Sequence, residues 1–272
     1  MHVPALKHWA RLAFAATCFG VLSPTTSVAA ESADVWSAVR ASLFGERPIA
    51  DAGSELSLAV PKRAEDAAVV PVAIRAAPVT GRGAPRKLYL VIDANPSPVS
   101  AAFEFGTDLG IPEIETRVRV EDNSTVRVIA EHADGSLSMT TRMIKASGGC
   151  SAPANRRDRD RNTLGHMQWL LPETSVAGEP VAVTLLIRHP NTSGLAMDQM
   201  TRLYEPPHFV RQVRVTYAGR LVWSADVDFS VSENPAFRFA FVPPGPGRLT
   251  ADVIDSNGLA FQGSVDVGAS TP

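Results

Sequence analysis

The sequence predicts an all-β protein of two immunoglobulin-like antiparallel β-sandwich domains, preceded by a short N-terminal helix. Apolar and polar side chains alternate with a period of two over many short segments, as in Arg117–Val120 and Val213–Tyr217. This alternation is typical of half-buried antiparallel strands. Turn sequences such as Asn257-Gly258 separate the segments, as expected for tight hairpins. Many short strands with turns between them favour β-sandwiches.

Residues 1–30 are predicted to be a cleaved signal peptide. Lys7 and Arg11 give a positive start, Leu12–Leu22 is apolar, and the small residues Val28 and Ala30 favour cleavage after position 30. The apolar run is too short for a retained membrane anchor. We therefore expect a periplasmic mature chain that has no membrane span.

The mature chain is expected to open with a helix over residues 34–44. Apolar residues recur every fourth position from Val35 to Leu43, and Gly45 and Pro48 end the pattern. Farther along, the continuous apolar run Leu88–Ile92 is expected to form a central strand.

Residues 151–162 are predicted to be a linker, because the segment is rich in Arg and Asp and has almost no apolar side chain. It divides the mature chain into residues 31–150 and residues 163–272. Each part has about the size of one immunoglobulin-like sandwich, and we expect the two to pack against each other within one chain.

The charge balance excludes some classes of partner. The chain has 26 basic and 28 acidic residues and a formal net charge of −2, so we expect neither a nucleic-acid partner nor a polybasic membrane patch. No nucleotide-binding loop or recognisable nucleophile motif is found, and we predict no cofactor. We also predict no metal site, because the histidines lack ligand spacing. Structural or packing roles are expected for His132, His166, His189, His208, Met197 and Met200.

Cys150 is the candidate functional residue. The only other cysteine, Cys18, lies in the predicted export signal, and the residues before it match lipid-attachment sites poorly. The mature chain would thus hold one thiol and no internal disulfide. Gly148 and Gly149 precede it, and glycines let the backbone flex and let a partner approach closely.

Nearby positive charge favours the reactive thiolate form of a cysteine. Lys145, Arg156 and Arg157 are close in sequence and are candidates to lower the thiol pKa or to attract an anion. The alternative for the two arginines is a solvated linker. The alternatives for Cys150 are an incidental thiol or an intermolecular disulfide that dimerises the protein.

Several short motifs carry a family resemblance in both parts of the chain. The first part contains Asp93–Val99, Glu115–Val120, His132–Gly135 and Ile144–Cys150; the second contains Arg188–Gly194, Pro206–Val210, Val231–Pro235 and Asp255–Gly258. In this order they resemble SoxY followed by SoxZ, the two subunits of a sulfur-compound carrier. The chain looks closest to fused SoxYZ-like carriers associated with quinoprotein dehydrogenases.

The resemblance implies a non-enzymatic carrier that holds a sulfur compound, as in thiosulfate oxidation, on Cys150 through an S–S bond. Its implied partners are periplasmic sulfur-oxidation enzymes or a quinoprotein dehydrogenase. Ser151 and Ala152 stand where the family has further glycines, and the cysteine is internal rather than terminal. An interaction or assembly module for such a dehydrogenase, with the thiol unused, is the alternative.

Overall fold

The computed structural model describes residues 28–77, 83–153, 163–173 and 175–268. Residues 1–27, which hold most of the predicted signal peptide, lie outside this part of the chain. The elements are α1 (Val28–Phe44), β1 (Ile49–Asp51), β2 (Leu56–Ala59), β3 (Val70–Ala76), β4 (Pro85–Ile92), β5 (Val99–Phe105), β6 (Gly110–Val118), β7 (Ser124–His132), β8 (Leu137–Ile144), β9 (Met167–Leu170), β10 (Val181–Ile187), β11 (Val210–Tyr217), β12 (Arg220–Val227), β13 (Ala236–Phe241), β14 (Gly247–Asp255) and β15 (Ala260–Val267).

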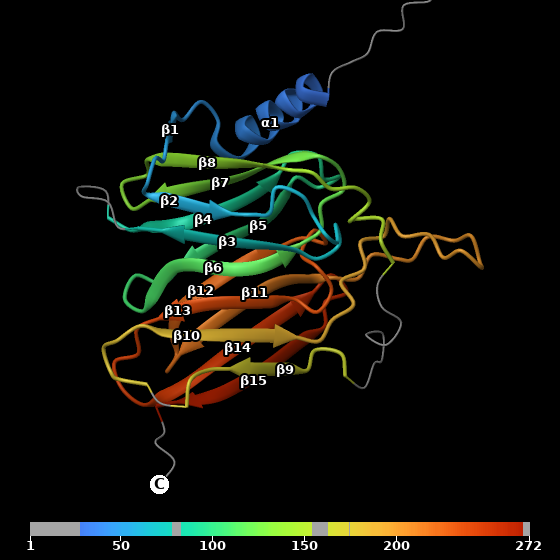
Figure 1. The fold of residues 1–272 in the computed structure, drawn as a ribbon. Helices are drawn as coiled ribbons and strands as arrows, with labels where there is room; N and C mark the ends of the chain where they lie inside the picture. Colours follow the sequence, from blue (N-terminus) through green and yellow to red (C-terminus); the bar gives the residue numbers. More distant parts are fainter. Residues whose placement is uncertain (1–27, 78–82, 154–162, 174, 269–272) are drawn as a thin grey trace, which may run out of the picture.

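The strands form two facing sheets (Figure 1). One has nine strands in the order β1-β8-β7-β4-β5-β12-β11-β14-β15, and the other has six in the order β2-β3-β6-β13-β10-β9. All pairs are antiparallel except β1 with β8, which is parallel. The predicted all-β sandwich fold is thus confirmed.

The two parts of the chain are joined edge to edge in both sheets. In the larger sheet β5 pairs with β12, with Phe105 opposite Trp223. In the smaller sheet β6 pairs with β13, with Ile114 opposite Phe239. Each part supplies the strand that covers an edge of the other, so edges that would otherwise be exposed are satisfied within one molecule.

An aromatic cluster fills the core beneath this junction. The ring of Trp223, from β12, lies 6.3 Å from that of Phe103 on β5, centroid to centroid. The corresponding distances to Phe237 and Phe239 on β13 are 5.3 and 5.4 Å. Because these rings come from both parts of the chain and are all buried, one continuous core stabilises both.

Helix α1 covers the outer face of the nine-stranded sheet beside β7 and β8 (Figure 1). Phe44 packs edge-on against Tyr89, with 5.1 Å between ring centroids. The guanidinium of Arg127 lies 4.6 Å from the ring of Trp36, in cation–π contact. The helix was predicted over residues 34–44; it begins earlier, at Val28, and ends at Phe44 as expected.

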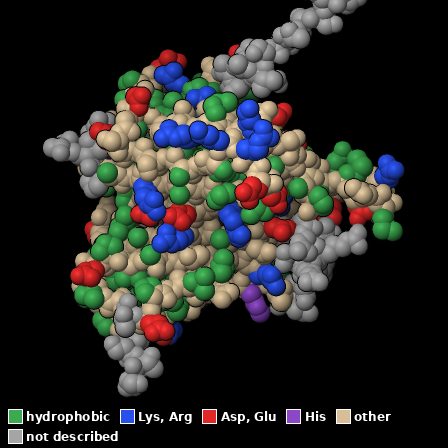
Figure 2. Space-filling view, viewed as in Figure 1, with side chains coloured by type: hydrophobic (Ala, Val, Ile, Leu, Met, Phe, Trp, Pro, Cys, Tyr) green, Lys and Arg blue, Asp and Glu red, His purple; other side chains and the backbone are tan. Residues whose placement is uncertain are grey.

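Charges of both signs are interspersed on the face shown in Figure 2. Ion pairs such as Arg75 with Glu113 and Glu115, and Arg238 with Glu115, link the neighbouring strands β3, β6 and β13 of the smaller sheet. Across the part of the chain that the structure describes, no helix has the length and apolar character needed to span a membrane.

Candidate functional site

The segment that carries Cys150 leaves β8 and is docked at the junction between the two parts of the chain. The backbone N–H of Gly148 donates to the carbonyl oxygen of Glu121 at 2.6 Å, and that of Gly149 donates to Val120 at 3.1 Å. Gly148 has a φ of +74°, which residues with a Cβ rarely adopt. Backbone hydrogen bonds therefore hold the segment along the loop that follows β6.

Gly149 is required here by close packing. A Cβ at this position would overlap the carbonyl oxygen of Ala67 and lie 2.6 Å from the carbonyl carbon of Ala67 and from the carbonyl oxygen of Val120. These are backbone atoms, which cannot rotate away as a side chain can. In this arrangement the glycine permits docking, and the flexibility predicted for Gly148 and Gly149 stays a prediction.

The Glu121 carboxylate caps the segment at the thiol. Its Oε2 accepts the N–H of Cys150 at 2.7 Å and the N–H of Ser151 at 3.2 Å. Its Oε1 accepts the Ser151 hydroxyl at 3.1 Å. One carboxylate thus fixes two consecutive residues.

The second part of the chain holds the segment from the other side. The Ser193 hydroxyl donates to the carbonyl oxygen of Cys150. Arg119, just beyond β6, bridges the two parts: Nη1 donates to Gly149 O at 3.3 Å, and Nη2 donates to Asn191 O at 3.2 Å. Residues from both parts therefore determine where the thiol lies.

The docked thiol is shielded and neutral. The side chain of Cys150 is 0% exposed. Burial, followed by the negative charge of Glu121, raises the pKa of the thiol to about 12, whereas Arg119 acts in the opposite direction. Because the thiolate is the reactive form, Cys150 is unreactive in this position. A disulfide between two molecules would first need the segment to leave its site.

Of the three basic residues predicted to support the thiolate, the structure describes only Lys145. Lys145 is exposed, and its backbone pairs with Lys62 and Ala64. Arg156 and Arg157 lie outside the described residues. Among the described residues, the cation that lowers the pKa of the thiol is Arg119.

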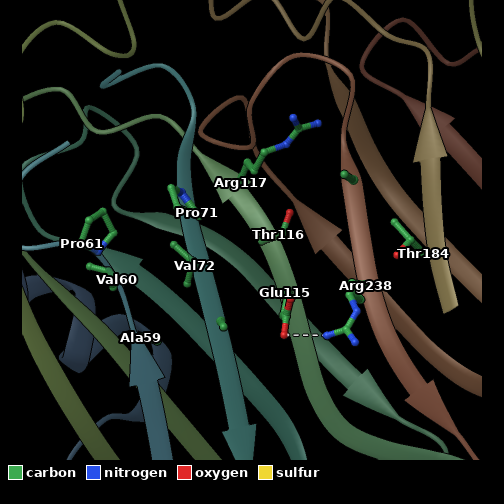
Figure 3. A pocket seen from close by; sticks show the side chains of 12 residues that line it. Ala59, Val60, Pro61, Pro71, Val72, Glu115, Thr116, Arg117, Thr184 and Arg238 are labelled. Atoms are coloured by element: carbon green, nitrogen blue, oxygen red, sulfur yellow. Dashed lines mark hydrogen bonds and ion pairs between the residues drawn. The ribbon is translucent and has the colours of Figure 1, made fainter. Parts of the chain in front are cut away.

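The burial of Arg119 could not be predicted from the sequence, because the alternation of buried and exposed residues in β6 stops at Val118. Val118, Arg119 and Val120 are buried in succession. A period-two pattern places Arg119 beside Arg117 on a polar face. Arg117 does lie on the outer face of the smaller sheet. It lines a hollow there together with Val72 and Arg238 (Figure 3).

We expect Glu121→Gln to lower the pKa of Cys150, because it removes the negative charge while keeping an oxygen that accepts the Cys150 N–H. The pKa should stay above that of an exposed cysteine, since burial is the larger cause. Alkylation by iodoacetamide between about pH 8 and about pH 10 should then be faster than in the parent protein. Asp122→Asn, at an exposed neighbouring carboxylate, is the control. An alkylation profile identical to that of the parent would contradict the assignment.

Three side chains that are far apart in the sequence meet close to this site. Nε2 of His208 lies 2.7 Å from Oδ2 of Asp255, and Nε2 of His189 lies 3.6 Å from the same oxygen. The other oxygen of Asp255 accepts the N–H groups of Asn257 and Leu259. The cluster has no recognisable ligand spacing because its residues lie far apart in the sequence and only the fold brings them together.

The cluster orients the loop that holds Arg119. The N–H of Asn191 donates to Nδ1 of His189 at 3.1 Å, so the proton of the neutral ring lies on Nε2 and leaves no lone pair there for a metal. Burial lowers the pKa of His189 to about 4. A structural role for His189 agrees with this geometry, and the absence of a metal stays a prediction.

A hydrogen-bonded hairpin projects beside the thiol segment (orange in Figure 1). Thr192 pairs with His208 near its base and Met197 with Tyr204 farther out. Met197 and Met200 were expected to pack but are exposed, Met200 by 85%. They share the hairpin with further exposed apolar residues: Leu195, Leu203 and Tyr204. The hairpin and the thiol segment, through Ser151 and Pro153, line one hollow.

Together, the fold and the site define an all-β sandwich protein with one described cysteine, held where its first part meets its second. Residues 40–150 match the family of "Sulfur oxidation protein SoxY" and residues 169–266 match "Sulphur oxidation protein SoxZ". The chain is therefore a fused SoxYZ-like protein. These families support a general carrier role in sulfur oxidation and agree with a non-catalytic protein.

Other comparisons add little. No curated protein matches the chain. Among solved structures, the chain is similar to a superoxide reductase (neelaredoxin) from Ignicoccus hospitalis, with 13% identity, a TM-score of 0.29, and coverage of 42% of this chain and 88% of that one. It is also similar to a glycosyl hydrolase family 2 member from Bacteroides cellulosilyticus, with 9% identity, a TM-score of 0.23, and coverage of 85% and 30%.

Proposed function

We propose that the protein is a periplasmic carrier that covalently holds a sulfur-compound intermediate on Cys150 and presents it to partner enzymes. The observation that carries this proposal is the position of the thiol. Cys150 is the last residue of the SoxY match, and residues of both the SoxY and SoxZ parts hold its backbone. The periplasmic location rests on the predicted signal peptide.

The carrier would alternate between a docked and a released segment. In the docked position the thiol is buried and its pKa is about 12, which protects it from unwanted reactions. The segment belongs to neither sheet. Its release would break the hydrogen bonds to Glu121, Arg119 and Ser193 and leave the sandwich intact.

The loading step needs an electron acceptor on the partner. When Cys150 and thiosulfate join through a new S–S bond, the two reactants lose two electrons and the thiol proton. The electrons would pass to a redox cofactor of the partner, such as a haem or a quinone. A partner enzyme would later hydrolyse or oxidise the adduct and return the thiol. The partners would be periplasmic sulfur-oxidation enzymes or a quinoprotein dehydrogenase.

Replacing Cys150 with serine is expected to abolish the carrier function, because the hydroxyl cannot form the S–S bond. The fold should be retained, since serine is smaller and the segment is fixed by backbone contacts. The measurements are substrate oxidation by cells that carry the variant, and mass spectrometry of protein purified without reductant. Ser147→Ala, at an exposed position in the same segment, is the control and should retain function.

The Cys150→Ser experiment also distinguishes the carrier from a second candidate function, an interaction or assembly module. The hairpin exposes Met200 and Leu203 to solvent, and exposed apolar clusters mark interaction surfaces, which favours an interaction or assembly module for a quinoprotein dehydrogenase. Such a module would keep its function in Cys150→Ser and lose it in Met200→Ser with Leu203→Ser. A carrier would lose its function in Cys150→Ser. Unmodified Cys150 in protein isolated while the pathway runs would also contradict the carrier.

A further inference from the structure

Arg119 is a buried cation beside the thiol segment. Its side chain is 1% exposed, and among the described residues it forms hydrogen bonds to backbone carbonyls but no ion pair. Burying a charge without a counter-charge is costly. Glu233 and Asp66 contribute negative charge around it, but burial is the larger effect and lowers the pKa of Arg119.

The guanidinium lies beside the thiol. Nη1 donates to Gly149 O at 3.3 Å and contacts Ala152 O at 3.5 Å, so it bonds to the chain on both sides of Cys150. Nε of Arg119 is buried and has no hydrogen-bond partner. The Glu121 carboxylate is occupied by the N–H groups of Cys150 and Ser151. A donor of Arg119 therefore remains for a ligand carried on the sulfur.

We propose that Arg119 is the anion-binding residue of the carrier and that it pairs with the oxyanion of a thiosulfonate-type group, –S–SO₃⁻, attached to Cys150 in the docked state. This deepens the proposed function and rests on it. A guanidinium suits such a group because its donors lie in a planar fork that matches oxyanions. The free thiol is neutral when docked, whereas a sulfonate is ionised at any physiological pH. Loading would therefore place an anion in direct contact with the guanidinium and favour docking of the loaded segment.

No other described cation near the segment offers the same site. Lys145 is exposed. Arg117 lies on the outer hollow and donates from Nη2 to the carbonyl oxygen of Asn234 at 3.1 Å. Because Arg117 is two residues from Arg119 but away from the thiol segment, it provides a matched control.

The test compares two chemical adducts of Cys150 on the full-length protein, loaded in mild denaturant and then dialysed. Tetrathionate gives the anionic adduct: the thiolate attacks an inner sulfur, one S–S bond forms, another breaks, and thiosulfate leaves with the electron pair. Methyl methanethiosulfonate gives a neutral methylthio adduct, –S–CH₃ on the Cys150 sulfur, by forming one S–S bond and releasing methanesulfinate. Thermal unfolding of each form is measured.

We expect the Tm of the anionic form to exceed that of the neutral form by at least about 3 °C. The difference should vanish in Arg119→Met, persist in part in Arg119→Lys, and persist fully in Arg117→Gln. Hydrogen bonds lost in Arg119→Met are lost for both adducts and cancel in the comparison. Equal Tm values for the two adducts of the parent protein, or a difference unchanged in Arg119→Met, would overturn the proposal.

A second measurement covers the case in which Arg119→Met does not fold. The rate at which dithiothreitol removes each adduct is normalised to the rate for the same adduct on the unfolded chain. The anionic adduct should be protected several-fold more than the neutral one in the parent and less so in Arg119→Lys; equal protection in the parent contradicts the proposal. Neither measurement uses partner enzymes. Equal behaviour of the two adducts would contradict the role of Arg119 alone. The carrier function itself would instead be contradicted if cells with Cys150→Ser kept the function.

Discussion

Replacing Gly149 with alanine is expected to dislodge the Cys150 segment and expose the thiol. The added methyl group would meet backbone atoms of Ala67 and Val120, so the segment must move as a whole. The backbone hydrogen bonds of Cys150 to Glu121 and Ser193 would be lost with it. The pKa of the thiol would then fall from about 12 toward the value of about 8.5 for an exposed cysteine.

The expected effect on reactivity is large. A fall of that size raises the thiolate fraction near pH 8 by up to roughly a thousandfold, and release from burial adds access. The rate of alkylation by iodoacetamide, followed by mass spectrometry, measures both. An alkylation rate and a Tm equal to those of the parent would show that the segment tolerates the methyl group, which would contradict the packing argument.

Two other glycines provide controls for backbone strain. Gly148 has a positive φ, but the nearest atom to an added Cβ is Ser151 Oγ at 3.7 Å. Gly135 also has a positive φ, with nothing within 4 Å. Alanine at either position should cost about 1–2 kcal/mol from the backbone conformation. Only Gly149→Ala should cause the full rise in thiol reactivity.

Trp223→Ala is expected to destabilise the SoxY and SoxZ parts together. The indole is 0% exposed and packs against Phe103 of the first part and Phe237 of the second. Removing a buried aromatic ring of this kind costs about 3–5 kcal/mol. For a chain of this size the Tm should fall by about 6–20 °C.

Calorimetry should show this loss as a downward shift of one transition that includes both parts, because they share strands and core. Trp169→Ala, on the edge strand β9 where the ring is partly exposed, is the matched control and should cost less. Two separate transitions in the parent protein, with only one shifted by Trp223→Ala, would contradict a shared core.

Local patterns in the sequence predicted the local elements well. The alternating segment Val213–Tyr217 lies in β11, and the apolar run Leu88–Ile92 lies in β4. Side-chain alternation reports which face of a strand is buried, and that is a local property.

The pairing of strands could not be predicted in this way. Whether β5 meets β12 depends on contacts between residues more than 100 positions apart, which periodicity does not encode. The burial of Arg119 and the meeting of His189 with Asp255 follow from the same long-range pairing. The sequence did identify Cys150 as the candidate residue, but it could not show that the thiol is shielded in the docked position.

The short connection between β8 and the thiol limits the geometry of any partner. Cys150 follows Ile144, the last residue of β8, by six residues, and six fully extended residues span about 20 Å. The reaction centre of a partner must therefore come within about this distance of the end of β8. Because the chain also continues beyond Cys150 to β9, the thiol would enter a partner's active site at the tip of a loop, with chain on both sides of it. An open cleft at the partner's surface fits that requirement better than a narrow, deep tunnel.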